Sequence, residues 1–169
     1  MLNIKMEHTL RVAADCRGIA HDLGWTVDRV ATAEVVGLLH DVARFPQFKQ
    51  FRTLLDRDSF NHGEHGYGVL MKHPVLDGFP QETRDAILAG VRYHNRKQMP
   101  GDLSAPALSL LKLIRDADKL DILHVIRDVA ENDNYDDHPE LMLGKDKLGP
   151  PTEALIGEIL ETKSGSYEH

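Results

Sequence analysis

The sequence predicts an all-α fold, a bundle of amphipathic helices, and three observations support this prediction. Apolar residues recur at spacings of three and four along several stretches of the chain. No stretch of useful length alternates apolar and polar residues as a half-buried strand would. The length of 169 residues, with 41% hydrophobic and 28% charged residues, suits one globular domain. We therefore expect a single domain over residues 1–169 with one buried core.

The first half of the chain predicts two long helices followed by a mixed segment. Helical periodicity covers about residues 3 to 23 and stops at Gly24, a residue typical of helix ends. A second periodic stretch covers about residues 28 to 43, and we expect Pro46 to end that helix. Residues 46–61 are polar and mixed, so we expect a loop with a short helical piece there.

The second half predicts four further helices. They cover about residues 62–72, 81–96, 104–130 and 152–162. Three glycines lower the helix propensity of the first of them, whereas Pro80 suits the start of the second. The stretch 131–140 is rich in acidic residues and is predicted to be a loop.

Charge and cysteine content exclude several classes of protein. The formal net charge is −7, so no bulk attraction to a nucleic-acid duplex is expected. No apolar run approaches the roughly 18 residues of a membrane span, so we expect no association with a membrane. Cys16 is the only cysteine, so an internal disulfide cannot form, and we expect a cytoplasmic protein. An anionic substrate would need local positive charge, which metal ions can supply.

Six residues of metal-binding types are the candidate site. They are His8, His40, Asp41, His62, His94 and Asp118. His40 and Asp41 follow an apolar run, where an unpaired buried carboxylate would be costly. A divalent cation removes that conflict, because it takes imidazole nitrogen and carboxylate oxygen together. Nitrogen and oxygen donors without thiolate favour one or two ions of Mn, Fe, Ni, Co, Mg or Zn.

The position of the His40-Asp41 pair in a helix limits how the site can form. Adjacent helical residues point about 100° apart, so both can reach one ion only near a helix end, which Phe45 and Pro46 are expected to supply. His8 and Asp118 would then close the site from other helices, in the core of the bundle.

Two groups of residues offer alternatives within the same pattern. His21 and Asp22 form a second histidine–aspartate pair, but they lie before Gly24, where a helix end meets solvent, so we expect no metal there. Asp116 and Asp121 are alternatives to Asp118. Asp121 lies three residues further along the same helical face, so it could instead contact a ligand from behind.

The order of these residues resembles the HD domain superfamily of metal-dependent phosphohydrolases, and in particular a bacterial subfamily. Five segments carry the resemblance: EHTLRVA, LLHDVARF, NHGEHG, RYHN and IRDADKLDIL. It covers His8 to about Arg127. Helices that usually flank this core in the family are expected to be missing at both ends. Asn61 stands where relatives often carry an acidic residue.

The resemblance implies a division of roles among the candidate ligands. The positions that match His8, His40, Asp41 and Asp118 bind the first metal, and those that match His62 and His94 bind a second. Asp41 would bridge the two ions.

The expected activity is hydrolysis of a phosphate ester in a small phosphorylated substrate, either a nucleotide or another monoester or diester. A bound metal lowers the pKa of water toward about 7, and Asp41 would help to orient that water. Arg44 or Lys119 would offset charge on the phosphoryl oxygens, although Arg44 could instead pair with Asp56 or Asp58. Alternatives are a di-iron oxygenase with the same donors and a non-catalytic module that senses a nucleotide. No Walker loop or GxGxxG motif indicates the substrate, and nothing indicates the oligomeric state.

Overall fold

The computed structural model describes residues 2–133 and 152–162, and these residues form helices and turns without a strand. The predicted all-α fold is therefore confirmed. The chain divides into two compact units, Met1–Asn132 and Asp133–His169. A single domain over residues 1–169 stays a prediction.

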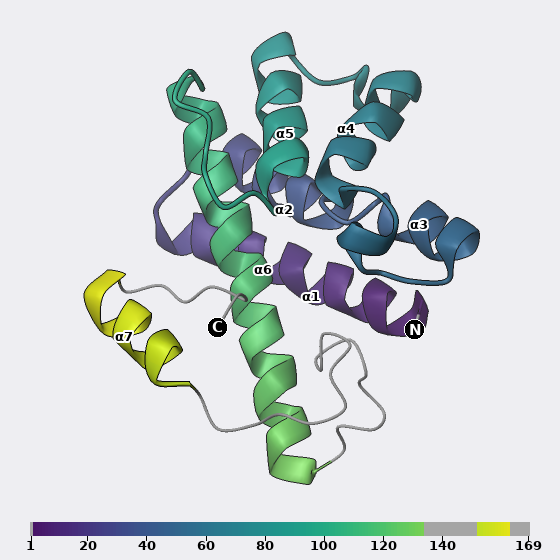
Figure 1. Cartoon of the computed structure of the whole chain (residues 1–169). Coiled ribbons are helices and arrows are strands. Elements are labelled where there is room, and N and C mark those ends of the chain that lie inside the picture. The colour runs from purple at the N-terminus through teal and green to yellow at the C-terminus, as the bar shows by residue number, and fades with distance from the viewer. Residues whose placement is uncertain (1, 134–151, 163–169) are drawn as a thin grey trace. The chain divides into compact units, whose positions relative to one another are not determined.

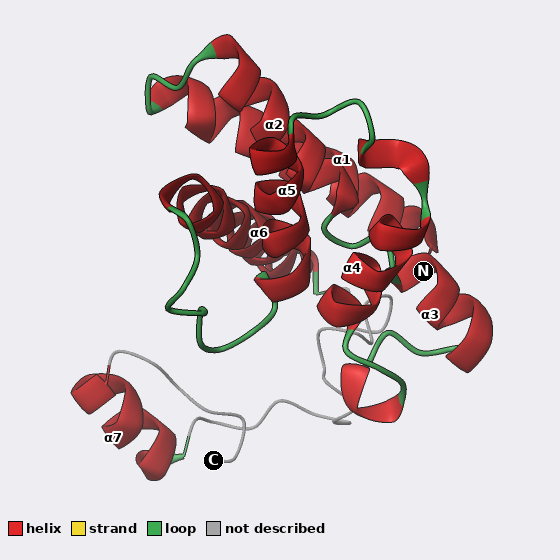
Figure 2. Ribbon diagram, turned by 90° about the horizontal axis from the view of Figure 1, so that it is seen from above, coloured by secondary structure: helices red, strands yellow, loops and turns green. Residues whose placement is uncertain are grey.

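The first unit is a helical bundle that contains every candidate ligand. Its elements are α1 (Leu2–Asp22), α2 (Val27–Leu39), α3 (Arg44–Phe51), the 3-10 turn η1 (Asp56–Asp58), α4 (His62–Lys72), the 3-10 turn η2 (Pro74–Leu76), α5 (Gln81–Tyr93) and α6 (Ala105–Asn132). Helix α1 packs on α2 and α6. Helix α5 lies between α4 and α6 (Figures 1 and 2). The bundle core therefore has helices from both halves of the sequence around it.

The described part of the second unit is one helix, α7 (Glu153–Thr162), close to its predicted range. Its residues Ile156, Ile159 and Leu160 are exposed. Helix α6 reaches Asn132, two residues beyond the predicted end. Most of the acidic loop predicted for residues 131–140 lies outside the described residues.

The predicted end of the second helix was wrong by four residues. Helix α2 ends at Leu39, and Pro46 does not stop it, because Pro46 lies in the first turn of α3. Proline fits there since the first N–H groups of a helix have no partner within the helix. The chain leaves α2 through two tight turns, in which Val42 N donates to Leu39 O (3.1 Å) and Arg44 N to Asp41 O (2.9 Å).

Two other predictions of boundaries need similar correction. Helix α5 ends at Tyr93 rather than at residue 96, because Arg96 N bonds to Tyr93 O (3.1 Å) in a tight turn. The segment 46–61 contains most of α3 and the turn η1, so it is more helical than its polar composition indicates.

Apolar side chains fill the centre of the bundle. The fully buried residues of the core include Val12, Cys16, Val36, Ile87, Leu111 and Ile114. Burial raises the pKa of the Cys16 thiol to about 12, so this cysteine is a packing residue and not a reactive thiolate. None of the described helices is long and apolar enough to cross a membrane.

Two glycines allow pairs of helices to come unusually close. A Cβ atom on Gly37 of α2 would lie 2.6 Å from Ala13 Cα of α1. A Cβ atom on Gly63 of α4 would lie 2.9 Å from Arg92 O of α5. Gly63 lowers the helix propensity of α4. The close packing of α4 against α5 nevertheless needs glycine at this position, because a side chain would meet the backbone of α5. Both close approaches bring together helices that carry the candidate ligands described next.

Candidate metal centre

The structure brings all six predicted ligands together inside the first unit. His8 lies in α1 and Asp118 in α6. His40 caps the C-terminus of α2, with Asp41 next to it. His62 begins α4 and His94 caps the C-terminus of α5, in the same way as His40 caps α2. The four imidazoles and Asp41 are buried, whereas the Asp118 side chain is 21% exposed.

The helix ends orient two of the four imidazoles. Each of these histidines turns back on the helix that it caps, so that His40 Nδ1 lies 2.7 Å from Gly37 O and His94 Nδ1 lies 2.8 Å from Val91 O. A carbonyl oxygen only accepts hydrogen bonds, so in both rings Nδ1 carries the proton. Nε2 is then left with a lone pair that points into the cluster.

Carboxylates orient the other two imidazoles. His8 Nδ1 lies 2.6 Å from Asp121 Oδ2, and His62 Nδ1 lies 2.7 Å from Asp56 Oδ2. A carboxylate behind an imidazole fixes its tautomer and makes the far nitrogen a better metal ligand. All four rings therefore direct Nε2 toward the same interior space.

The Nε2 atoms meet in two pairs at distances that suit a cation bound between them. His8 Nε2 and His40 Nε2 lie 3.3 Å apart, and His62 Nε2 and His94 Nε2 lie 3.0 Å apart. With the protons held on Nδ1, two lone pairs face each other in each pair and repel. A divalent ion removes that repulsion, so the donor set fits a metal.

Asp41 lies between the two pairs. Its Oδ2 is 3.7 Å from His8 Nε2 and 3.8 Å from His40 Nε2. Its Oδ1 is 3.4 Å from His62 Nε2 and 3.9 Å from His94 Nε2.

Asp118 completes the first of the two groups. Its Oδ1 lies 3.2 Å from His8 Nε2 and 3.7 Å from His40 Nε2. The first group is therefore His8, His40, Asp41 and Asp118, and the second is Asp41, His62 and His94. In each group two histidines and Asp41 have the spacing needed to hold an ion.

Positive charge keeps the central carboxylate ionised. Burial alone would raise the pKa of Asp41, but the ammonium of Lys5, the imidazoles of His40 and His62 and the guanidinium of Arg44 hold it well below its usual range. Lys5 Nζ lies 3.1 Å from Asp41 Oδ2, and Arg44 Nε lies 3.4 Å from Oδ1. Each oxygen of this carboxylate therefore has one cationic side chain and one pair of imidazoles beside it.

The pKa values of two other groups also favour metal-binding forms. Burial would raise the pKa of Asp118, but the imidazoles of His40 and His8 beside it lower that pKa below its usual range, so the carboxylate is charged at neutral pH. Burial, with the imidazoles of His40 and His62 nearby, lowers the pKa of His94 to about 3. Neutral His94 can therefore donate its lone pair over the whole physiological range.

Asp56 belongs to the site, although the sequence indicated it only as an ion-pair partner of Arg44 at the surface. Its carboxylate accepts hydrogen bonds from His62 Nδ1, Arg44 Nη1 (2.9 Å) and Gln47 Nε2 (3.1 Å). Asn61, where relatives often carry an acid, instead caps α4 by accepting from Glu64 N (2.9 Å). The acid behind His62 thus comes from the turn η1, five positions before Asn61.

Lys5 was also missed, although the spacing offered a signal. It lies three residues before His8 on one face of α1, as Asp121 lies three residues after Asp118 on α6. The contact proposed for Asp121 behind a ligand is present in the structure, on His8. Arg11 also donates to Asp121 and fixes that carboxylate from the solvent side.

The two cations predicted to bind phosphate, Arg44 and Lys119, lie in different environments. Arg44 lies beside Asp41 and also pairs with Asp56, so both of its predicted environments occur together at one largely buried position. Lys119 is exposed and has no hydrogen bond or ion pair with other described residues, so it is not brought to the cluster. His21 and Asp22 bond to each other at the surface, where their side chains are 82% and 85% exposed.

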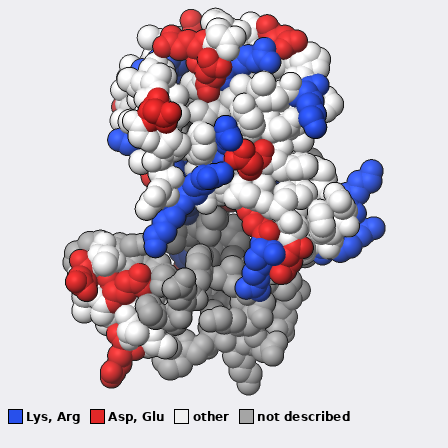
Figure 3. Space-filling model, turned by 45° about the horizontal axis from the view of Figure 1, so that its top comes forward, with Lys and Arg blue, Asp and Glu red and all other residues white. Residues whose placement is uncertain are grey.

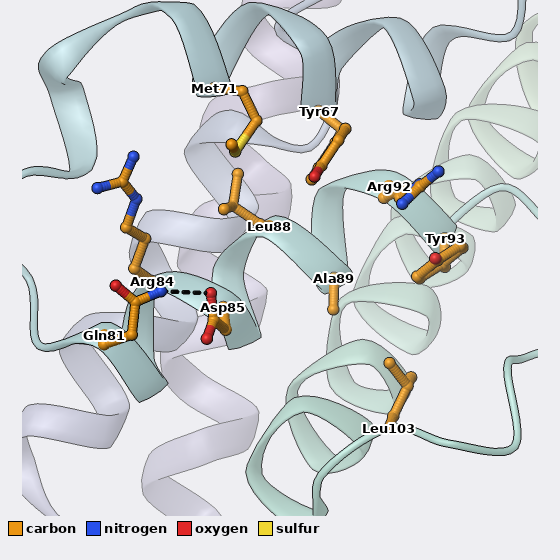
Figure 4. Close-up of a pocket in the computed structure, with 10 residues that line it drawn as sticks. All are labelled: Tyr67, Met71, Gln81, Arg84, Asp85, Leu88, Ala89, Arg92, Tyr93 and Leu103. Carbon is orange, nitrogen blue, oxygen red and sulfur yellow. Dashed lines mark hydrogen bonds between the residues drawn. The ribbon is translucent and has the colours of Figure 1, made fainter.

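One cavity lies away from this cluster, on α4, α5 and the segment that carries Leu103 (Figure 4). It measures about 480 Å³. Arg92, which lines it, bonds to Glu64 (2.6 Å), and Gln81 bonds to Asp85 (2.8 Å). None of the six predicted ligands lines this cavity.

A family model named HD domain matches residues 6–123, which is more than half of the chain and includes all six ligands. The chain belongs to the HD domain family. HD domains are generally metal-dependent hydrolases that bind divalent metals. The resemblance seen in the sequence is confirmed at the level of this family, and the bacterial subfamily stays a prediction. No curated protein and no solved structure matches the chain.

Proposed function

We propose that this HD domain hydrolyses a phosphate ester in a small phosphorylated substrate, with two divalent metal ions held by the cluster. One observation carries the proposal: four imidazoles fixed through Nδ1 direct Nε2 toward the two oxygens of Asp41. The first ion would be held by His8, His40, Asp41 and Asp118. The second would be held by His62, His94 and the other oxygen of Asp41.

When bound, divalent metals lower the pKa of water and polarise phosphoryl oxygens, which is the chemistry that phosphate-ester hydrolysis needs. The chain adds fixed charge and orientation to this chemistry. Arg44 places a guanidinium beside Asp41 Oδ1, held by Gln47 Oε1 at 2.8 Å, where negative charge on a phosphoryl oxygen can be offset. Asp41, which directs one oxygen toward each group of ligands, would help to orient the attacking water between the two groups.

The exposed members of the cluster indicate where a substrate would enter. Asp118 and Lys5 have side chains that are 21% and 20% exposed, whereas the four imidazole side chains are at most 7% exposed. A phosphate group would therefore reach the ions from the side of Lys5 and Asp118. Acidic and basic side chains both occur over the described part of the face in Figure 3.

The test is a metal analysis of protein purified without chelator, followed by assays on phosphomonoesters and phosphodiesters with Mn²⁺ added. We expect bound metal and chelator-sensitive hydrolysis. Iron with oxygen consumption would select the oxygenase alternative. Metal binding without any turnover would favour the nucleotide-sensing module.

Matched alanine variants of the two histidine–aspartate pairs test the assignment of the site. His40→Ala and Asp41→Ala should abolish metal retention and lower the melting temperature, since bound metal stabilises only the folded chain. His21→Ala and Asp22→Ala change the same residue types at exposed positions and should do little. Equal metal loss in both sets of variants would overturn the assignment.

A further inference from the structure

Lys5 differs from the other cation in the cluster by being tied to one partner. Arg44 donates to Gln47 Oε1, Leu54 O and Asp56 Oδ1, so its guanidinium is fixed by the protein. Among the described residues, Lys5 Nζ has a single hydrogen bond, to Asp41 Oδ2. An ammonium has three donors, so two remain available for another acceptor.

That single partner is an oxygen which the first ion also needs. Asp41 Oδ2 faces His8 Nε2 and His40 Nε2 and accepts from Lys5 at 3.1 Å. An ion held by this oxygen would place a second positive charge beside Nζ, in a largely buried site where salt screens charges only weakly. The two positive charges would repel each other, and both would draw on one oxygen.

The position of Lys5 gives its ammonium somewhere to go. Its side chain is 20% exposed, whereas the Asp41 side chain that it contacts is 4% exposed, so Lys5 lies between the buried carboxylate and solvent. The flexible four-carbon stem can move the charge without moving the helix. An anion bound at the ions would offer the acceptor that Asp41 no longer provides.

We propose that Lys5 is an exchanging counter-charge: its ammonium neutralises Asp41 in the metal-free protein and binds a phosphate oxygen of the substrate in the metal-loaded protein. The second half of this proposal rests on the proposed function. The two halves predict effects of opposite sign when the charge is removed. Damage to the fold would weaken the binding of both metal and phosphate, so the signs separate this role from a structural one.

The test uses the full chain, stripped of metal and titrated with Mn²⁺ in a calorimeter, and then the Mn²⁺-loaded protein titrated with inorganic phosphate. Lys5→Met keeps the length of the side chain without its charge. We expect Mn²⁺ to bind about tenfold more tightly, because a nearby like charge is gone. We expect phosphate to bind about tenfold or more weakly, the usual loss for a hydrogen bond to a charged group.

Two further variants complete the design. Lys49→Met, at an exposed position of α3, changes the net charge equally and should leave both affinities unchanged. Lys5→Arg retains the charge and should keep phosphate affinity within a few-fold of the unaltered protein.

Weaker Mn²⁺ binding by Lys5→Met, or phosphate affinity that Lys5→Met does not lower, would overturn the proposal. If Lys5→Met fails to fold, Lys5→Gln replaces it in both titrations, because glutamine keeps a hydrogen-bond donor beside Asp41 without the charge. Weaker Mn²⁺ binding or unchanged phosphate affinity in Lys5→Gln overturns the proposal in the same way. Opposite shifts in the two affinities in a protein that hydrolyses no phosphate ester would support the role of Lys5 while the proposed hydrolysis fails.

Discussion

Replacing Gly37 by alanine should push α1 and α2 apart and weaken metal binding from a distance. The new Cβ atom would lie 2.6 Å from Ala13 Cα and 3.0 Å from Ala13 N. Carbon atoms in contact lie about 3.5–4.0 Å apart, so the helices must separate by roughly 1 Å. The clash is with backbone, which cannot rotate away. Overpacking of this kind costs about 1–3 kcal/mol, or a fall of roughly 2–12 °C in melting temperature for a chain of this size.

The same displacement reaches the metal centre through the two helices. His8 lies on α1 and His40 at the end of α2, and their Nε2 atoms are 3.3 Å apart. A shift of about 1 Å is large compared with the tolerance of roughly 0.5 Å for an ordered functional site. We expect Gly37→Ala to lower Mn²⁺ affinity by about tenfold or more, although the residue touches no metal.

Thermal unfolding with and without Mn²⁺ measures both effects, and α1 offers a matched control. Gly18 lies within α1 on its exposed side, and a Cβ atom added there would meet nothing within 4 Å. Gly18→Ala should stabilise the protein by up to about 1 kcal/mol, because alanine has the higher helix propensity. The two substitutions thus have opposite expected signs. A Gly37→Ala protein as stable as the unaltered chain, with equal metal affinity, would refute the reasoning about close helix approach.

Three further outcomes are expected. Asp56→Asn removes the carboxylate behind His62 and should weaken the second ion by about 10–100-fold in calorimetry, whereas the same change at exposed Asp58 should not; equal affinities would show that Asp56 does not support the ligand. The double variant His62→Ala, His94→Ala should halve the metal count in elemental analysis without unfolding the chain, and an unchanged count would mean a single ion. In metal-free protein, the pKa of His94 is about 3 when folded, against an ordinary value of 6.5, so the unfolded chain binds more protons between these values. Stability should therefore fall as the pH drops from 6.5 toward 3, and chemical denaturation of His94→Asn should show a smaller fall; an equal fall would assign the effect to other groups.

The positions of the ligands were predictable because helical periodicity and residue type carry them. His40 and Asp41 follow an apolar helix face, and His8 lies on the buried face of α1, so each had to point inward. The predicted end of α2 is wrong because proline ends a helix only in its interior, whereas Pro46 lies in the first turn of α3, which tolerates proline. That end decides the orientation of His40, whose Nδ1 turns back to the carbonyl three residues earlier.

The contact between Asp56 and His62 depended on the fold and could not be predicted from sequence spacing. Asp56 reaches His62 only because η1 lies against the start of α4, and no periodic pattern places that turn. Lys119 and Lys5 differ by helical phase. Lys119 is one residue, about 100°, away from Asp118, whereas Lys5 is three residues from His8 and shares its face. A rule of i to i+3 neighbours around each candidate ligand would have found Lys5.

The donors belong to segments far apart in the chain, from His8 in α1 to Asp118 in α6, with α2, α4 and α5 contributing between them. A divalent ion shared by them would act as a cross-link that ties the first helix of the bundle to the sixth, closing a loop of more than a hundred residues. Such a tie restricts opening of the whole unit and not only of the residues around it. Chelation should therefore speed hydrogen exchange at amides throughout α1 and α6, including those several turns from the ligands, while α7, which supplies no donor, exchanges at an unaltered rate.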